Sequence, residues 1–263
     1  MTTIPEALQD LQKTVFDRNQ REYASEPEYL AISVIEDEIH VTLCAFCMEE
    51  GYDEILASIA HQDIACHISS LKLIGPDEGS NGTRHWDISP LVNSASTFTS
   101  LKEFSIQRTS PTDHNTSIIG EDYEEDGQIS KFLAKCPSLM SLTCPSAPNS
   151  DFFEIGSDSL TSLRLDAGYD TQNFIKNLAN SSSFPNLRYL EWSDFCSGEL
   201  KDNVENPTSY DDYVALFKSK AFDKVSMVVL KNPFLSKEEL DSLNKIKPEL
   251  SIKVVTVSSH YVR

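Results

Sequence analysis

The sequence predicts a single α/β domain in which short parallel strands stack side by side and helices cover one face of the resulting sheet. Three observations predict it. A six-residue apolar frame recurs eight times along the chain. Helix-sized amphipathic segments separate the frames. Prolines close several of these segments just before the next frame begins. A strand, a helix and a further strand in the same direction together form a parallel sheet with its helices outside.

The recurring frame has apolar residues at its first, fourth and sixth positions. Its copies occupy residues 41–46, 68–73, 101–106, 139–144, 160–165, 187–192, 225–230 and 252–257. The fourth and sixth side chains point to the same side of a strand, because side chains alternate along it. A lone strand of this kind cannot bury its apolar side, whereas a stack of them forms a continuous core.

The segments between frames follow a helical period. Residues 53–62, 128–136 and 171–178 each place their apolar side chains on one face. Ser209 and Ser236 are followed three residues later by an acid, Asp212 and Glu239, a pattern that starts helices. Pro137 blocks continuation of the helix before it.

With these frames and helices, the chain resembles the leucine-rich-repeat family in its helix-containing, ribonuclease-inhibitor-like form. The resemblance covers residues 41–257 and is strongest at residues 159–165 and 184–190. Within the family, the chain is similar in pattern to small, irregular intracellular bacterial members. It implies a solenoid, a short right-handed horseshoe with a parallel sheet on the concave face and helices on the convex face. The frames start 21 to 38 residues apart, a spacing more irregular than the family pattern. Most of them also lack the asparagine that the family has soon after the strand. We interpret Asn232 as a shifted copy of that asparagine. We therefore expect long inserted loops.

The first 40 residues do not fit the frame. Ile4, Leu8, Leu11 and Val15 lie along one helical stripe. We interpret residues 1–40 as a helical cap over the open end of the first repeat, with an edge strand at residues 29–35, and residues 41–263 as the repeat domain.

The chain is strongly acidic. It has 22 basic and 41 acidic residues and a formal net charge of -19. This charge disfavours nucleic acid and anionic membranes as partners and favours a partner protein with a basic surface. The alternative explanation is that the negative charge serves only to keep the protein soluble. We expect a cytoplasmic protein with reduced thiols, for three reasons. The cysteines are scattered, no signal-peptide pattern is present, and no apolar stretch is long enough to cross a membrane.

No segment carries a convincing catalytic motif. Cys44 and Cys47 have the spacing of a redox motif, but Cys44 is expected to be buried in a frame. Residues 113–124 imitate a calcium loop, except that Ile118 replaces the turn glycine, so we interpret them as a flexible acidic insertion. His61 and His67 flank a helix-to-strand corner and are the residues of an alternative metal site. We expect no enzyme activity, no cofactor and no metal.

The expected partner-binding residues fall into two groups. The third, fifth and seventh frame positions face away from the core, on the expected concave face. The candidates there are Glu103, Gln107, Arg164, Asp166, Tyr189 and Glu191, with Lys72 and Lys231 beside them. Two insertions combine acids with tyrosine and supply Glu121, Asp122, Tyr123, Glu124, Glu125, Asp126, Tyr210, Asp211 and Asp212.

These features together favour a non-catalytic module that binds another protein through its concave face and acidic loops. The sharper hypothesis is an inhibitor or immunity protein that neutralises a basic enzyme or toxin. An adaptor or scaffold subunit of a larger assembly is one alternative. The other is a metal-dependent enzyme with a loop-borne site near His61 and His67.

Overall fold

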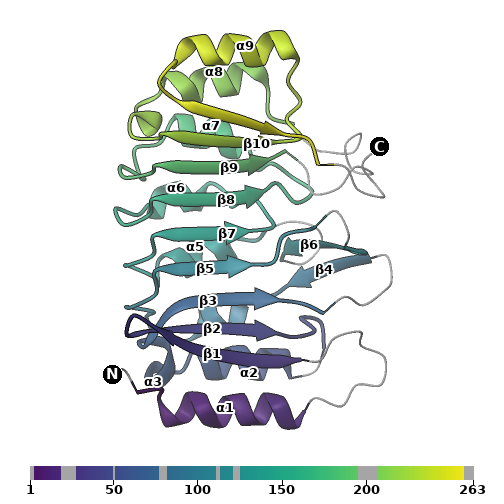
Figure 1. Cartoon of the computed structure of the whole chain (residues 1–263), viewed down its shortest axis with the longest axis vertical. Helices are drawn as coiled ribbons and strands as arrows, with labels where there is room; N and C mark the ends of the chain where they lie inside the picture. The colour runs from purple at the N-terminus through teal and green to yellow at the C-terminus, as the bar shows by residue number, and fades with distance from the viewer. Residues whose placement is uncertain are drawn as a thin grey trace.

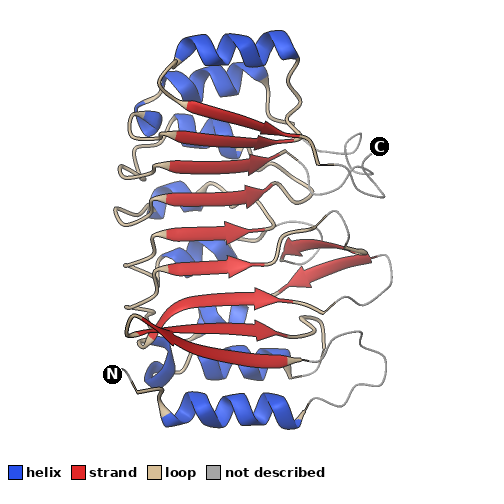
Figure 2. Ribbon diagram, viewed as in Figure 1, coloured by secondary structure: helices blue, strands red, loops and turns tan. Residues whose placement is uncertain are grey.

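The computed structural model describes residues 3–18, 28–49, 51–76, 82–110, 113–120, 125–194 and 207–257. In this part of the chain the fold is mixed α/β. An open, mostly parallel sheet runs along the long axis of the molecule, and helices pack on one side of it (Figure 1, Figure 2). The predicted fold class is confirmed at this level.

The large sheet follows the order of the chain. Its strands are β1 (Tyr29–Ile35), β2 (Glu38–Cys44), β3 (Ile68–Ile74), β5 (Glu103–Ile106), β7 (Ser141–Cys144), β8 (Ser162–Asp166), β9 (Tyr189–Ser193), β10 (Met227–Lys231) and β11 (Ser251–Val255). Each strand pairs with the next in this order. Among the described strands of this sheet, only the β1–β2 pair is antiparallel. The eight predicted frames therefore lie on strands that are adjacent and parallel.

The register confirms the frame in the six central repeats. Fourth positions face each other across neighbouring strands, as in the pairs Leu142–Leu163 and Leu163–Leu190. Sixth positions do the same, as in Leu165–Trp192. The central fourth- and sixth-position side chains are all buried: Leu71, Leu73, Phe104, Ile106, Leu142, Cys144, Leu163, Leu165, Leu190, Trp192, Val228 and Leu230.

The first and last frames are placed wrongly by the sequence pattern. Val41 pairs with Leu71 and so takes a fourth position instead of a first. Ile252 pairs with Val228 and likewise takes a fourth position. Both segments have an apolar residue at almost every second position, so the frame fits at more than one register. The pairing of β2 with β3 also shifts its register between Ile39 and His40, so a strict repeat of the frame does not hold there.

The helices are α1 (Glu6–Asp17), α2 (Tyr52–Ile59), α3 (Gln62–Ala65), α4 (Ser89–Asn93), α5 (Gln128–Leu133), α6 (Asp151–Ile155), α7 (Phe174–Ala179), α8 (Tyr210–Lys218), the 3-10 helix η2 (Lys220–Phe222) and α9 (Lys237–Ile246). Helices α5, α6 and α7 lie behind the sheet in Figure 1 and leave its other face open. Helices α1, α2, α5, α7, α8 and α9 lie in segments that the sequence predicts to be helical, whereas α4 and α6 lie in segments for which it predicts no helix. Within the described ranges, none is long and apolar enough to cross a membrane.

The N-terminal segment packs against the first repeats. Leu8, Leu11 and Val15 of α1 are buried, as the helical stripe predicts. The side-chain amide of Gln12 donates a hydrogen bond of 2.7 Å to the carbonyl oxygen of Leu30 and joins α1 to β1. Strand β1 has the predicted bounds and closes the edge of the sheet beside β2.

A small second sheet is a feature that the sequence pattern does not predict. Strands β4 (Gly82–Trp86) and β6 (Asn115–Ile119) pair in parallel beyond the ends of β3 and β5 (Figure 1). Strand β4 follows β3 and lies between the frames at residues 68–73 and 101–106. Strand β6 follows β5 and lies between the frames at residues 101–106 and 139–144. The interpretation of residues 113–124 as a flexible acidic insertion is therefore wrong for Asn115–Ile119, where Ile118 and Ile119 are buried.

Both predicted capping boxes are present. The Ser209 side chain accepts a hydrogen bond from the backbone N–H of Asp212, and the Asp212 carboxylate accepts one from the Ser209 N–H. Ser236 and Glu239 make the same reciprocal pair at α9. Each box satisfies two backbone donors that the first turn of a helix otherwise leaves without partners.

We expect Ser236→Ala to lower the free energy of unfolding by about 1 kcal/mol, because it removes the acceptor for the Glu239 N–H. Urea denaturation measures the change. Ser236→Asp is the control, since it keeps an acceptor at the cap and should remain close to the wild type. Equal destabilisation by alanine and aspartate would contradict the capping role.

Candidate functional site

The candidate site is the face of the large sheet that points away from the helices, here called the open face. It presents the third, fifth and seventh frame positions, as predicted. Register pairing aligns the fifth positions in one row across the sheet. This row consists of Thr42, Lys72, Ser105, Thr143, Arg164, Glu191, Val229 and Lys253.

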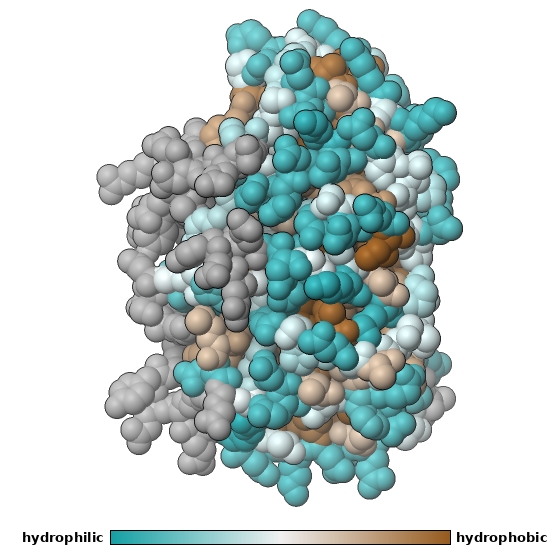
Figure 3. All heavy atoms as spheres, turned by 180° about the vertical axis from the view of Figure 1, so that it is seen from behind, coloured by the Kyte–Doolittle hydropathy of each residue, from teal (hydrophilic) through white to brown (hydrophobic). Residues whose placement is uncertain are grey.

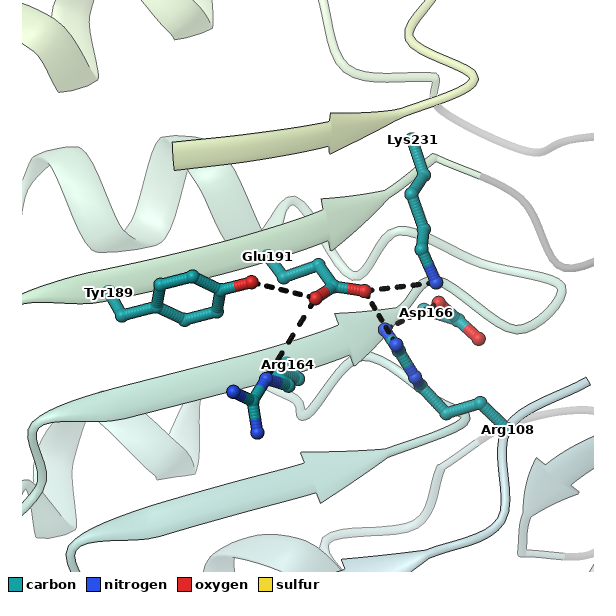
Figure 4. A network of polar contacts seen from close by, with 6 residues as sticks. All are labelled: Arg108, Arg164, Asp166, Tyr189, Glu191 and Lys231. Carbon is teal, nitrogen blue, oxygen red and sulfur yellow. Dashed lines mark hydrogen bonds and ion pairs between the residues drawn. The ribbon is translucent and has the colours of Figure 1, made fainter. Parts of the chain in front are cut away.

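A polar network lies on the C-terminal half of the open face (Figure 4). Glu191 is its centre. The carboxylate of Glu191 accepts a hydrogen bond of 2.9 Å from the Tyr189 hydroxyl and one of 2.5 Å from Nη2 of Arg108. Nζ of Lys231 lies 2.9 Å from the same carboxylate. Two cations and a phenol thus hold the Glu191 side chain in one position.

Arg108 links distant repeats. It follows β5, and its guanidinium reaches β8, where Nη1 lies 3.2 Å from Oδ1 of Asp166, as well as Glu191 on β9. Strand β7 lies between β5 and β8 in the sheet, so the arginine side chain spans one intervening strand. The sequence pattern does not single out Arg108, because it lies one residue beyond the seventh frame position, Gln107.

The network has opposite effects on its two carboxyl groups. Burial acts to raise the pKa of Glu191, but the hydrogen bonds and charges of Arg108 and Lys231 outweigh it and lower that pKa to about 2. Burial raises the pKa of Asp166, and the charges of Arg108 and Lys231 offset this only in part. Glu191 is therefore the firmly ionised acid of the pair.

Arg164 is the exposed member of the network. Its guanidinium carbon lies 5.0 Å from the centre of the Tyr189 ring, which places the cation over the ring face. Its Nε atom lies 3.8 Å from Oε2 of Glu191, and its side chain is 44% exposed. In Figure 4 its two terminal nitrogens point away from Glu191.

The charge of the open face differs in sign from that of the whole protein. The described third, fifth and seventh frame positions, taken together with Arg108, include five cations and three acids, a difference of +2, against -19 for the chain. The cations are Lys72, Arg108, Arg164, Lys231 and Lys253, and the acids are Glu103, Asp166 and Glu191. Asp166 and Glu191 were expected to offer negative charge to a basic partner. Their charge is instead neutralised within the face by Arg108 and Lys231.

The remaining predicted residues on the sheet have simpler surroundings. Glu103 is exposed on β5. The side-chain oxygen of Gln107 accepts a hydrogen bond of 2.7 Å from the backbone N–H of Gly75, which joins the ends of β5 and β3.

The predicted acidic insertions are only partly described. Residues 121–124, which include Glu121, Asp122, Tyr123 and Glu124, lie outside the described residues, as do residues 195–206. Asp126 and Asp211 are exposed, Tyr210 is half-buried at the start of α8, and Asp212 belongs to the capping box.

Glu125 was predicted to contact a partner, but the structure places it inside the protein. It is buried, and its two carboxylate oxygens accept hydrogen bonds from the backbone N–H groups of Ile129 and Asn149. Burial raises the pKa of Glu125 in spite of these bonds. Its role is to hold the start of α5 and not to meet a partner.

A second buried acid, Asp194, was missed by the sequence analysis. It follows β9 and is fully buried. Its Oδ1 accepts a hydrogen bond of 2.9 Å from the Trp192 indole, and its Oδ2 accepts one of 3.0 Å from the Tyr213 hydroxyl of α8. Burial raises the pKa of Asp194. The residue joins the sheet to the helix layer inside the core and offers no surface for chemistry.

The cysteine and histidine candidates do not form a site in the described structure. Cys44 is buried, as expected, and so is Cys47. Nδ1 of His61 lies 3.5 Å from a carboxylate oxygen of Asp63 at the start of α3. No group of three or more metal-ligating side chains occurs among the described residues.

Comparison with protein-family models and with curated protein sequences gives no match for this chain.

Proposed function

We propose that the chain is a helix-containing leucine-rich-repeat protein that binds another protein through its open face and carries out no catalysis. The observation that carries the proposal is the open face itself. It is left uncovered by the described helices, and on it an internal ion-pair network holds an exposed arginine and a tyrosine in place (Figure 4). Such fixed aromatic and arginine side chains are typical anchors of protein interfaces.

The repeat assignment is supported by how successive units connect. The strand–loop–helix unit recurs along the sheet in chain order. Asn232, which follows β10, accepts a hydrogen bond of 2.8 Å at its side-chain oxygen from the backbone N–H of Val257 in the next unit. Its own N–H donates to the carbonyl oxygen of Val255. This bonding between repeats agrees with the interpretation of Asn232 as a shifted copy of the family asparagine.

The inhibitor form of the proposal concerns the surface outside the open face. The net charge of -19 favours encounter with a basic protein, for example a cationic enzyme or toxin. The exposed acids Asp126 and Asp211 belong to this surface. A scaffold subunit would use the same open face. The metal-dependent alternative near His61 and His67 gains no support from the described residues.

The test compares variants of the full chain in binding a partner. A partner is first captured from the native cell extract and then measured directly with purified proteins. We expect Tyr189→Ala to weaken binding about ten-fold or more, since it removes an anchor of the polar network on the open face. Lys176→Ala, at an exposed position of α7 on the helix side, is the control. Equal affinity of both variants and the wild type would contradict binding through the open face.

A further inference from the structure

We infer that the open face binds an acidic, extended segment of its partner, with Arg164 receiving a carboxylate. This inference rests on the proposed function, because it assigns a ligand chemistry to the same face. It differs from the charge argument made for the whole chain, which favours a basic partner.

The charge balance of the face is the first support. The carboxylates of Asp166 and Glu191 are saturated by Arg108 and Lys231, whose own charges are used in the same contacts. Arg164 and Lys72 then remain as exposed cations, opposed by the single exposed acid Glu103 among the described residues of these central strands. A surface of this sign selects negative groups, even on a protein whose total charge is -19.

The geometry of Arg164 is the second support. The guanidinium carbon lies over the Tyr189 ring, and Nε lies 3.8 Å from Oε2 of Glu191. These two contacts hold the guanidinium group in place before any ligand arrives. The two terminal nitrogens point away from Glu191 in Figure 4, and the side chain is 44% exposed. Such a pair of nitrogens forms the fork that receives both oxygens of a carboxylate.

The shape of the face between the two exposed cations is the third support. In the fifth-position row, Ser105 and Thr143 separate Lys72 from Arg164. In the third-position row, Ser141 and Ser162 lie beside them. These short hydroxyl side chains leave the sheet surface accessible to an extended chain and offer it hydrogen bonds.

The strand spacing sets the size of the expected segment. Lys72 on β3 and Arg164 on β8 are separated by three strand intervals. At about 4.8 Å per interval they lie about 14 Å apart. An extended peptide covers that span with about four residues, so two acids about four positions apart match the two cations.

The experiment uses the full chain and a fluorescent peptide of about eight residues, built from glycine and serine with two glutamates about four positions apart. Anisotropy titration at low salt measures the affinity, and the same peptide with glutamines is the comparison. We expect the glutamate peptide to bind about ten-fold more tightly and to lose affinity as salt rises. Equal binding of the two peptides would overturn the inference.

Charge-reversal variants locate the contact. Arg164→Glu should weaken binding of the glutamate peptide about ten-fold or more, whereas Lys176→Glu, the same change of charge on α7, should leave it nearly unchanged. Glu103→Gln should strengthen it, since an opposing charge is removed. A change in the NMR signal of the Tyr189 ring on titration should accompany binding to the wild type. Equal effects of Arg164→Glu and Lys176→Glu would overturn the assignment.

The two proposals fail in distinguishable ways. If Tyr189→Ala abolishes binding of the native partner while the acidic peptide does not bind, the open face is the binding surface but its ligand is not acidic. If Tyr189→Ala has no effect on the native partner, the proposed function itself fails.

Discussion

Trp192→Ala is expected to lower the free energy of unfolding by about 3–5 kcal/mol, the cost of removing a large, fully buried aromatic side chain. Trp192 is fully buried at the sixth frame position of β9. Its ring stacks on Phe174 of α7 at a centroid distance of 5.1 Å, and its indole N–H donates to Asp194. The alanine variant therefore leaves a cavity between sheet and helices and deprives a buried carboxylate of a donor.

The control for this prediction is Trp192→Phe, which keeps an aromatic ring against Phe174 but removes the N–H. We expect it to cost about 1–2 kcal/mol, since mainly the hydrogen bond to Asp194 is lost. Urea denaturation followed by circular dichroism measures both variants. Stability of Trp192→Ala within about 0.5 kcal/mol of the wild type, the range of an ordinary surface substitution, would show that this ring is not packed between the layers as described.

Glu191→Gln is expected to lower the free energy of unfolding by about 2–3 kcal/mol at neutral pH. The substitution leaves Arg108 and Lys231, which are mostly buried, without their shared anion. The lowered pKa of Glu191, about 2 instead of 4.5, corresponds to about 3 kcal/mol of favourable interaction in the folded state.

The pH dependence of this difference follows from the direction of the pKa shift. The folded state holds Glu191 ionised to a lower pH than the unfolded state does. Its contribution is therefore complete above the unfolded pKa near 4.5 and disappears as the pH falls towards about 2. Asp166 has a raised pKa, so its contribution to the free energy of unfolding changes with pH in the opposite direction. The informative quantity is therefore the difference in the free energy of unfolding between the wild type and Glu191→Gln.

The measurement is a series of urea titrations of both proteins between neutral and acidic pH. The difference should shrink below pH of about 4.5. Glu103→Gln is the matched control on the same face, and it should stay within about 0.5 kcal/mol of the wild type throughout, because Glu103 makes no ion pair with another described residue. A difference for Glu191→Gln that stays constant with pH would contradict the charged network.

The fold could be predicted wherever local signals were periodic. The alternation of Leu163 and Leu165, and of Leu190 and Trp192, fixes which side of a strand meets the helices, so the central registers were recoverable. The serine caps of α8 and α9 are local too. At the ends of the sheet, apolar residues occur at almost every second position, and the pattern alone could not choose the register.

The missed features depend on contacts between residues far apart in the sequence. Strands β4 and β6 stabilise each other across 33 residues between Gly82 and Asn115, and neither continues the frame. Arg108 meets Glu191 across 83 residues. No period or motif marks such a pair, because only the stacking of repeats brings its members together.

This difference also explains the error over charge. From the sequence, Asp166 and Glu191 counted as free acids on a contact surface. Their charges are balanced by Arg108, which the frame did not include, and by Lys231 on the neighbouring strand. The residues of the open face could thus be predicted from alternation, whereas the sign of its charge required the structure.

The most direct test of the stacked-repeat arrangement is NMR measurement of cross-strand contacts between backbone protons in the deuterated full chain. Parallel pairing in the described register places Arg164 beside Thr143 on one side and beside Glu191 on the other. Nuclear Overhauser contacts for both pairs are the expected result. Contacts that join Arg164 to other residues, or that show antiparallel pairing of β8 with β9, would contradict the repeat stack and the open face built on it.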